Sequence, residues 1–442
     1  MIGILVTYSL TLFGTIAGLV VPFYGLLAYV ALAILKPEAL WSWSVPASNY
    51  SRIVAISMLI GWGLRGCGDW RLGKAKGITL ALLGFWFSSI FGAATCEFPE
   101  AGWYFASQIG KIVAPFIVGI TTVRTTKQVR ILAWVILICQ GYIALQMNLY
   151  YFGGYNKLKE EGFAGLDNNG YAISLNAAIG LAFFLGLYEE KLWKKGIAFF
   201  FWFLMVNAVM FSYSRGGMLA LCITGGVSFL LIPKRSTHYV MLGLAIALGV
   251  RLAGEEVTER FMTIFAEARN RDRSAESRLE LWTACWQAMI ENPLFGIGPD
   301  HFELKAHTFG FKKGKAAHSL WFEVGAELGF PGIICLIAFY FLCIKGLWRL
   351  SRRLANSPDA DPWLKPIASM VISSLIGFIV SAQFVTVEAV EIPYYVTLLG
   401  AIVIKHQSRR PNHSLEDEED EAEGDEAEYD WDYHEEDALA TV

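Results

Sequence analysis

Residues 254–319 read GEEVTERFMTIFAEARNRDRSAESRLELWTACWQAMIENPLFGIGPDHFELKAHTFGFKKGKAAHS. This segment is both long and charged, whereas most of the remaining chain is apolar enough to lie in lipid or forms short connections. The chain has 442 residues, of which 55% are hydrophobic and 17% are charged. A soluble domain could not bury so much apolar surface, and the apolar runs match the roughly 20 residues that a helix needs to cross a bilayer. The sequence therefore predicts an all-α, polytopic integral membrane protein with one large polar loop.

The apolar runs predict about 12 or 13 membrane-spanning helices. The first run, from Ile2 to Leu35, is broken by Pro22 and forms either a hairpin of two short helices or one long tilted helix. Further spans are predicted near 51–66, 77–95, 103–121, 129–151, 169–188, 196–213, 216–232, 238–253, 330–348, 366–386 and 393–405. The predicted regions are an N-terminal transmembrane bundle at 1–253, the large loop at 254–319, C-terminal transmembrane helices at 320–405 and an acidic tail at 411–442.

Lys and Arg residues in the short loops predict the orientation of the bundle, because basic loops stay on the cytoplasmic side. The basic loops are Arg65–Lys76, Arg124–Arg130, Lys191–Lys195, Lys234–Arg235 and Lys345–Lys365. They alternate with weakly basic loops, so the large loop is predicted to lie outside and the C-terminus inside. A hairpin at Pro22 would place the N-terminus outside, and a single span would place it inside. The first residues lack a basic region and a clear cleavage site, so we interpret them as a membrane segment rather than a removed signal.

Residues 412–442 contain 15 Asp and Glu residues and no Lys or Arg, which leaves 36 basic and 25 acidic residues in the rest of the chain. This segment has too few aliphatic residues to fold, so we expect a solvated, disordered tail. The sequence shows no glycine motif of the Walker or dinucleotide type, no Cys-x-x-Cys and no carboxylate–histidine spacing typical of a metal site. It therefore predicts no cofactor, no metal and no nucleic-acid partner.

Arg215 is the first candidate for a functional residue. It stands in Ser-Arg-Gly-Gly at 214–217, where one apolar span ends and the next begins. An arginine at this depth is costly unless it is paired or reaches polar headgroups. One alternative is a ligand site, because the two glycines would let a ligand approach the backbone closely. The other is a snorkelling side chain at a helix end.

Arg278 lies on a predicted helix that Ser274 could cap and that ends before Asn292-Pro293. The spacing of the apolar positions predicts an amphipathic helix against the membrane surface. These positions are Leu279, Trp282, Trp286, Met289 and Ile290. The positions three and four residues from Arg278 hold Ser, Ala, Leu and Trp, which cannot neutralise an arginine. The alternatives for Arg278 are a ligand contact and a solvated surface residue.

His318 stands where the helix leading into the next span begins. It could accept a proton near neutral pH, and the structural alternative is a helix cap. Lys312, Lys313 and Lys315 form a basic cluster with Lys305. This cluster either attracts anionic lipid or sugar, or is simply solvated.

Together these residues resemble the O-antigen ligase and polymerase family of bacterial membrane proteins. The matching stretches are Ser-Arg-Gly-Gly at 214–217, Arg278 followed by Trp282 and by Asn-Pro-Leu-Phe-Gly-Ile-Gly-Pro at 292–299, and His318 followed by Glu-Leu-Gly-Phe-Pro-Gly at 327–332. Asp-Asn-Asn-Gly-Tyr-Ala at 167–172 is similar to the branch of O-glycosylation ligases associated with exosortase systems. The resemblance covers about residues 165–345, and the acidic tail lies outside the family pattern.

The resemblance implies a GT-C-like fold and a glycosyltransferase of the cell envelope. It implies transfer of a preassembled glycan from undecaprenyl diphosphate to a hydroxyl acceptor, either lipid or protein, on the outer face of the bacterial cytoplasmic (inner) membrane and without a metal. By the same resemblance, Arg215 and Arg278 would bind the diphosphate and His318 would be the base. Direct attack by the acceptor would invert the anomeric centre.

Other functions remain open from the sequence. A polymerase would extend the glycan on its lipid carrier, and a transporter or flippase would move lipid-linked glycans across the membrane. Transporters carry ionisable residues inside their spans, where this sequence offers Lys111 and Arg251, whereas most polar residues gather outside the spans. A non-catalytic scaffold that docks through its acidic tail is a further alternative.

Overall fold

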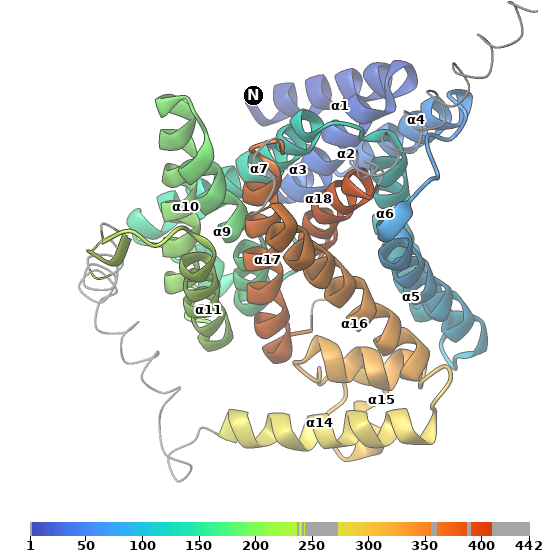
Figure 1. Cartoon of the computed structure of the whole chain (residues 1–442). Helices are drawn as coiled ribbons and strands as arrows, with labels where there is room; N and C mark the ends of the chain where they lie inside the picture. The colour runs from blue at the N-terminus through green and yellow to red at the C-terminus, as the bar shows by residue number, and fades with distance from the viewer. Residues whose placement is uncertain are drawn as a thin grey trace, which may run out of the picture.

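The computed structural model describes residues 2–236, 238–240, 243, 273–354, 360–386 and 390–408. Within these residues the regular elements are helices, as predicted, and nine of the described helices are long and apolar enough to cross a membrane (Figure 1). The principal helices are α1 (Ile2–Val20), α2 (Pro22–Leu35), α3 (Pro37–Leu40), α4 (Tyr50–Leu64), α5 (Lys76–Thr95), α6 (Pro99–Thr122), α7 (Thr126–Phe152), α8 (Lys157–Glu160), α9 (Asn168–Tyr188), α10 (Leu192–Phe211), α11 (Arg215–Leu231), α14 (Arg273–Glu291), α15 (Phe302–Lys305), α16 (Leu320–Leu354), α17 (Leu364–Ser381) and α18 (Ile392–Gln407). The chain is a multi-pass membrane protein.

The first apolar run is a hairpin, which decides between the two predicted alternatives. Pro22 occupies the first position of α2, where its fixed φ and missing N–H are tolerated. The two helices approach so closely that a Cβ on Gly25 would lie 2.7 Å from the Cα of Gly18. Trp41, which follows α3, packs against Gly3 at the start of α1. The N-terminus of the hairpin therefore lies at the same end of the bundle as the end of α2.

Several of the basic loops meet on one face, which we call the basic face. Lys405 Nζ near the end of α18 donates to the carbonyls of Asp69 and Ile120, both at 2.7 Å. Arg130 Nη2 at the start of α7 lies 3.1 Å from Glu189 Oε1, just after α9. These contacts agree with the predicted grouping for the loops at 65–76, 124–130 and 191–195.

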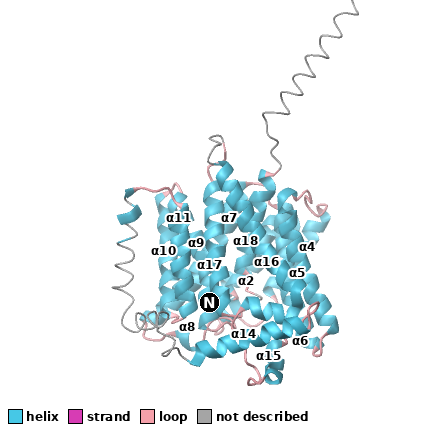
Figure 2. Cartoon of the chain, turned by 60° about the horizontal axis from the view of Figure 1, so that its bottom comes forward, coloured by secondary structure: helices cyan, strands magenta, loops and turns pink. Residues whose placement is uncertain are grey.

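The less basic loops meet on the opposite face, which we call the loop face. Lys305 Nζ lies 2.9 Å from Glu97 Oε2. This ion pair joins α15 to the connection between α5 and α6. The N–H of Leu320 donates to the carbonyl of Val385 at 3.0 Å, which joins the start of α16 to the end of α17. Figure 2 shows α14, α15 and α8 gathered at one end of the long helices. That the loop face points outward remains a prediction.

Two helices shape the loop face. Helix α14 lies across it, beside the first turns of α16 (Figure 1). The chain bends inside α16 at Gly329, whose φ of 66° and ψ of −167° lie in a region that only glycine adopts readily. The turns before the bend accompany α14, and those after it return across the bundle.

Helix α14 matches the predicted amphipathic helix with two corrections. It ends at Glu291, as expected before Asn-Pro, but Ser274 already lies inside the helix and so does not cap it. Met289 does not belong to the exposed apolar face, because it is buried against Gly325 of α16. The exposed apolar side chains of this helix are Leu279, Trp286 and Ile290.

Two of the sequence predictions concern residues that the structure does not describe. Most of the predicted span at 238–253 and all of the predicted tail at 411–442 lie outside the described residues.

Candidate functional site

Arg215 is the first residue of α11, and Ser214 caps that helix because its Oγ accepts a hydrogen bond from the N–H of Gly217 at 3.1 Å. A Cβ on Gly216 would lie 2.9 Å from the Cβ of Phe384, and Gly217 is equally close to α9. The two glycines therefore let α11 pack against its neighbours, whereas the sequence had suggested ligand approach. Arg215 is half-buried at a helix N-terminus, where the helix dipole favours an anion.

The N-terminus of α9 lies beside this turn. Asp167 caps α9, since its Oδ1 accepts the N–H of Gly170 at 2.7 Å. Asn168 Nδ2 donates to the carbonyl of Ser212 at 2.8 Å, which ties the start of α9 to the turn before α11. Two helix N-termini thus open side by side on the loop face.

His318 lies two residues before α16, so it is not the cap of that helix. Its backbone has a φ of 54°, a left-handed conformation that costs a residue other than glycine roughly 1–2 kcal/mol. The segment is held from outside, because Trp282 Nε1 of α14 donates to the carbonyl of Ala317 at 3.1 Å. On the other side of His318, the contact between Leu320 and Val385 anchors the start of α16.

Glu323 supplies a further anchor for this segment. Its side chain is buried, with 3% of Glu323 exposed, and accepts a hydrogen bond from the hydroxyl of Thr386. It therefore ties the start of α16 to the connection between α17 and α18. The sequence analysis missed this role, since one glutamate in an apolar helix carries no pattern that names its partners.

Charges around His318 identify its neighbours. Burial lowers the pKa of the His318 imidazole, the positive charges of Arg278 and Lys315 lower it further, and the carboxylate of Asp167 raises it. Such effects act over short distances, so these side chains lie near one another. His318 is therefore neutral at pH 7 and can accept a proton. Arg278 and Asp167 thus both lie near His318, although the sequence gave Asp167 no catalytic or binding role. That Arg278 and His318 form one functional site stays a prediction.

Arg215 is linked to this cluster through the end of α17. Phe384 packs against Gly216, and the next residue along the chain accepts the N–H of Leu320. The turn that carries Arg215 and the segment that carries His318 therefore lie against the same short stretch of chain.

Two of the sequence motifs meet at the bend in α16 and form a clasp. The buried carboxylate of Glu327 accepts the backbone N–H of Asp300 at 2.6 Å and that of Phe302 at 2.7 Å. Its own backbone carbonyl accepts the N–H of Gly298 at 3.1 Å. These contacts fix the loop after α14 against α16. The motifs that follow Arg278 and His318 thus build the frame of the site rather than its reactive groups.

His301 belongs to the same frame. It is buried, and its Nε2 accepts the backbone N–H of Phe98 at 2.9 Å. Its Nδ1 lies 2.8 Å from the carbonyl of Pro299, so the proton is on Nδ1 and donates to that carbonyl. With both nitrogens bonded to backbone, His301 holds the loop against the start of α6.

The predicted lysine cluster separates into different environments. Lys315 is near His318, Lys305 is paired with Glu97, and Lys312 and Lys313 are exposed on the loop face. Substrate binding by Lys312, Lys313 and Lys315 remains a prediction. Across the described ranges, no group of three or more His, Cys, Asp and Glu side chains could hold a metal ion.

Comparison with known families gives matches to two segments of the chain. Residues 199–337 match the family described as O-Antigen ligase, and residues 1–183 match a family of unknown function. No curated protein matches the chain. The first match contains Arg215, Arg278 and His318 together with the clasp at the bend in α16, whereas the predicted relation to the exosortase-associated branch stays a prediction. Residues 199–337 of this membrane protein are therefore similar to the O-antigen ligase family.

Proposed function

We propose that this protein is a glycosyltransferase that moves a preassembled glycan from undecaprenyl diphosphate to a hydroxyl acceptor, on the outer face of the cytoplasmic membrane and without a metal. The family match supports glycan transfer in a membrane. The single observation that carries the assignment of the site is the hydrogen bond from Trp282, one helical turn after Arg278 on α14, to the carbonyl of Ala317, which sets the His318 segment beside Arg278.

In the proposed reaction the acceptor oxygen attacks the anomeric carbon of the glycan. The bond from that carbon to the diphosphate oxygen breaks, and its electron pair leaves on undecaprenyl diphosphate. The guanidinium groups of Arg215 and Arg278 stabilise this charge with bidentate hydrogen bonds, and the N-terminus of α11 adds its dipole. Attack and departure on opposite sides invert the anomeric centre.

His318 takes the proton of the acceptor hydroxyl as the new bond forms. Its lowered pKa keeps the imidazole neutral before the reaction, and the carboxylate of Asp167 stabilises the imidazolium that results. The anchors on Ala317 and Leu320 hold His318 in its left-handed backbone conformation. Positioning of the base thus comes from α14, α16 and the end of α17 together.

The test is a transfer assay with the purified protein in liposomes. It uses a labelled undecaprenyl-diphosphate glycan, envelope lipid or protein as acceptor, and parallel samples with a chelator. We expect label on the acceptor, equally with and without chelator. Label only on longer glycans still attached to the carrier would instead assign a polymerase. Movement of unchanged donor across the bilayer would assign a flippase, and strong inhibition by chelator would contradict the metal-free mechanism.

The outer-face assignment is tested separately in intact spheroplasts. Lys313 is exposed on the loop face and Lys127 is exposed on the basic face. A membrane-impermeant thiol reagent should modify Lys313→Cys and spare Lys127→Cys, each measured against the parent protein because Cys222 is exposed. The reverse labelling pattern would place the site in the cytoplasm.

A further inference from the structure

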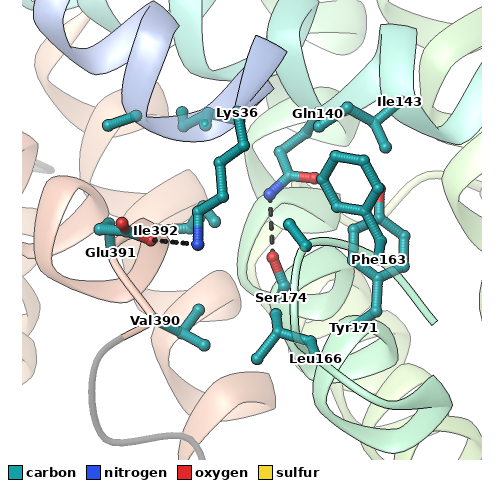
Figure 3. Close-up of a pocket in the computed structure, with 13 residues that line it drawn as sticks. Lys36, Gln140, Ile143, Phe163, Leu166, Tyr171, Ser174, Val390, Glu391 and Ile392 are labelled. Atoms are coloured by element: carbon teal, nitrogen blue, oxygen red, sulfur yellow. Dashed lines mark hydrogen bonds and ion pairs between the residues drawn. The ribbon is translucent and has the colours of Figure 1, made fainter. Parts of the chain in front are cut away.

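A small cavity lies between α2, α7, α9 and the start of α18, next to the loop that precedes α9 (Figure 3). Its volume is about 20 Å³, which is room for one water-sized group and far too small for a sugar ring or a polyprenyl chain. The polar residues that line it are Lys36, Gln140, Tyr171, Ser174 and Glu391. The cavity can therefore receive only the tip of a larger molecule.

Two of the residues that line this cavity, Gln140 and Tyr171, are polar and buried. Gln140 and Tyr171 are each 1% exposed, and Gln140 Nε2 donates to Ser174 Oγ at 2.9 Å. Gln140 Oε1 and the hydroxyl of Tyr171 have no hydrogen-bond partner within the described part of the chain. An amide oxygen needs a donor, and a phenol can donate in return. A hydroxyl group has both functions, since it can donate to the amide oxygen and accept from the phenol.

The mouth of the cavity carries a balanced pair of charges. Lys36 Nζ lies 3.9 Å from Glu391 Oε2, and both side chains are partly exposed. Figure 3 shows Lys36 directed toward the space between Glu391 and Ser174. A neutral polyol can donate to the carboxylate and accept from the ammonium, whereas an anion would meet Glu391 and a cation would meet Lys36. The pair therefore favours a second, neighbouring hydroxyl.

The cavity adjoins the proposed active site through the loop before α9. Leu166 lines the cavity, and the next residue is Asp167, whose charge acts on His318. Apart from Val390, Glu391 and Ile392, the lining residues lie within 1–183. The arginines proposed to bind the diphosphate lie on α11 and α14, which do not line it. The cavity is thus separate from the charged part of the donor site.

We propose that this cavity is an acceptor-recognition subsite: one hydroxyl of a carbohydrate-bearing acceptor enters between Gln140 and Tyr171 while another hydroxyl of the same acceptor reacts at His318. The proposal rests on the transferase function given above. It assigns acceptor recognition to the N-terminal segment that matches a family of unknown function, and glycan transfer to the segment that matches the O-antigen ligase family.

The experiment compares two acceptor probes in the liposome assay, at concentrations that leave the liposomes intact. Octyl glucoside carries several hydroxyls, and octanol carries one. Each is measured as an acceptor or as a competitor of the envelope acceptor, with Tyr171→Phe, Gln140→Leu and wild type. Tyr395→Phe is the matched control, because Tyr395 is also buried and without a hydrogen-bond partner among the described residues but does not line the cavity.

We expect Tyr171→Phe and Gln140→Leu each to raise the KM or inhibition constant of octyl glucoside about threefold to tenfold, with kcat, donor KM and the octanol constant unchanged. Tyr395→Phe should leave all values unchanged. Thermal unfolding should show that Tyr171→Phe is at least as stable as wild type, since the change removes an unpaired hydroxyl.

Three results would overturn the subsite: unchanged octyl glucoside constants in both variants, equal effects on octyl glucoside and octanol, or an altered donor KM instead. Wild type that transfers to envelope acceptor but ignores octyl glucoside would also overturn it. If wild type transferred glycan to no acceptor at all, that result would contradict the proposed function itself and not only the subsite.

Discussion

The cluster around His318 and the cavity around Tyr171 share the loop that precedes α9, yet they present opposite kinds of chemistry. The cluster contains half-buried arginines, a neutral histidine and a carboxylate at the N-termini of two helices. The cavity contains neutral polar atoms that are fully buried, with one ion pair at its mouth. Fixed charge suits a diphosphate leaving group, and unpaired neutral groups suit a hydroxyl.

This difference suggests how one membrane protein handles two unlike substrates. In the proposed division, residues of 199–337 bind the charged donor, and the cavity that recognises the acceptor is lined mainly by residues of 1–183. Changes in the cluster should therefore alter the rate of transfer, whereas changes in the cavity should alter acceptor affinity alone.

The largest effect is expected from Arg215→Lys and Arg278→Lys. Lysine keeps the charge but cannot reproduce the planar, bidentate fork of arginine. Loss of one such contact costs roughly 2–4 kcal/mol in the transition state, or about 30- to 1000-fold in rate. The control is Arg124→Lys, at an exposed position on the basic face, which should be unaffected. Transfer by Arg215→Lys or Arg278→Lys at the control rate would remove the diphosphate role from that arginine.

A smaller effect is expected at Glu323, which we assign as a positioning residue. Glu323→Ala removes the buried acceptor of the Thr386 hydroxyl near the start of α16 and should lower kcat roughly 5- to 100-fold. Glu323→Gln should restore most of the rate, because its amide can still hydrogen-bond to Thr386. The measurement is kcat and acceptor KM for both variants, with thermal unfolding as the check on folding. Equal damage by Gln and Ala would show that the negative charge, rather than the hydrogen bonds, is needed.

The smallest expected effect is a shift in the pH profile. Transfer requires neutral His318, so its rate should fall at low pH as His318 is protonated. Arg278 lowers the pKa of His318, so Arg278→Gln should raise that pKa and move the acid limb to higher pH. Asp167 raises the pKa, so Asp167→Asn, which keeps the helix cap, should move the limb to lower pH. If the acid limbs of the two variants moved in the same direction, or if neither limb moved, the proposed cluster around His318 would be contradicted.

Most of the fold could be predicted from the sequence because bilayer thickness sets a simple length rule for apolar runs. Pro22 marked the break between α1 and α2, although only the close packing of Gly18 on Gly25 decided in favour of the hairpin. The distribution of Lys and Arg likewise grouped the loops on two faces. These signals are local, so a single sequence displays them.

The site was only partly predictable, because its remaining contacts join residues far apart in the chain. His318 and Arg278 were identified, but Asp167 lies 151 residues before His318, and no spacing rule connects them. The same holds for Glu323 and its partner Thr386. At the two glycines after Arg215 the motif suggested a ligand contact, but the structure shows that they allow close helix packing.

The proposed role of His318 as the base for glycan transfer can be measured apart from donor binding in a single-turnover experiment. Labelled undecaprenyl-diphosphate glycan is bound to wild type, His318→Ala and His307→Ala in liposomes, and product is followed after acceptor is added. His307 is an exposed histidine in the same segment and serves as the matched control. We predict that His318→Ala binds the donor normally but forms product about 10²- to 10⁴-fold more slowly, and that His307→Ala matches wild type. Near-normal product formation by His318→Ala would contradict the account.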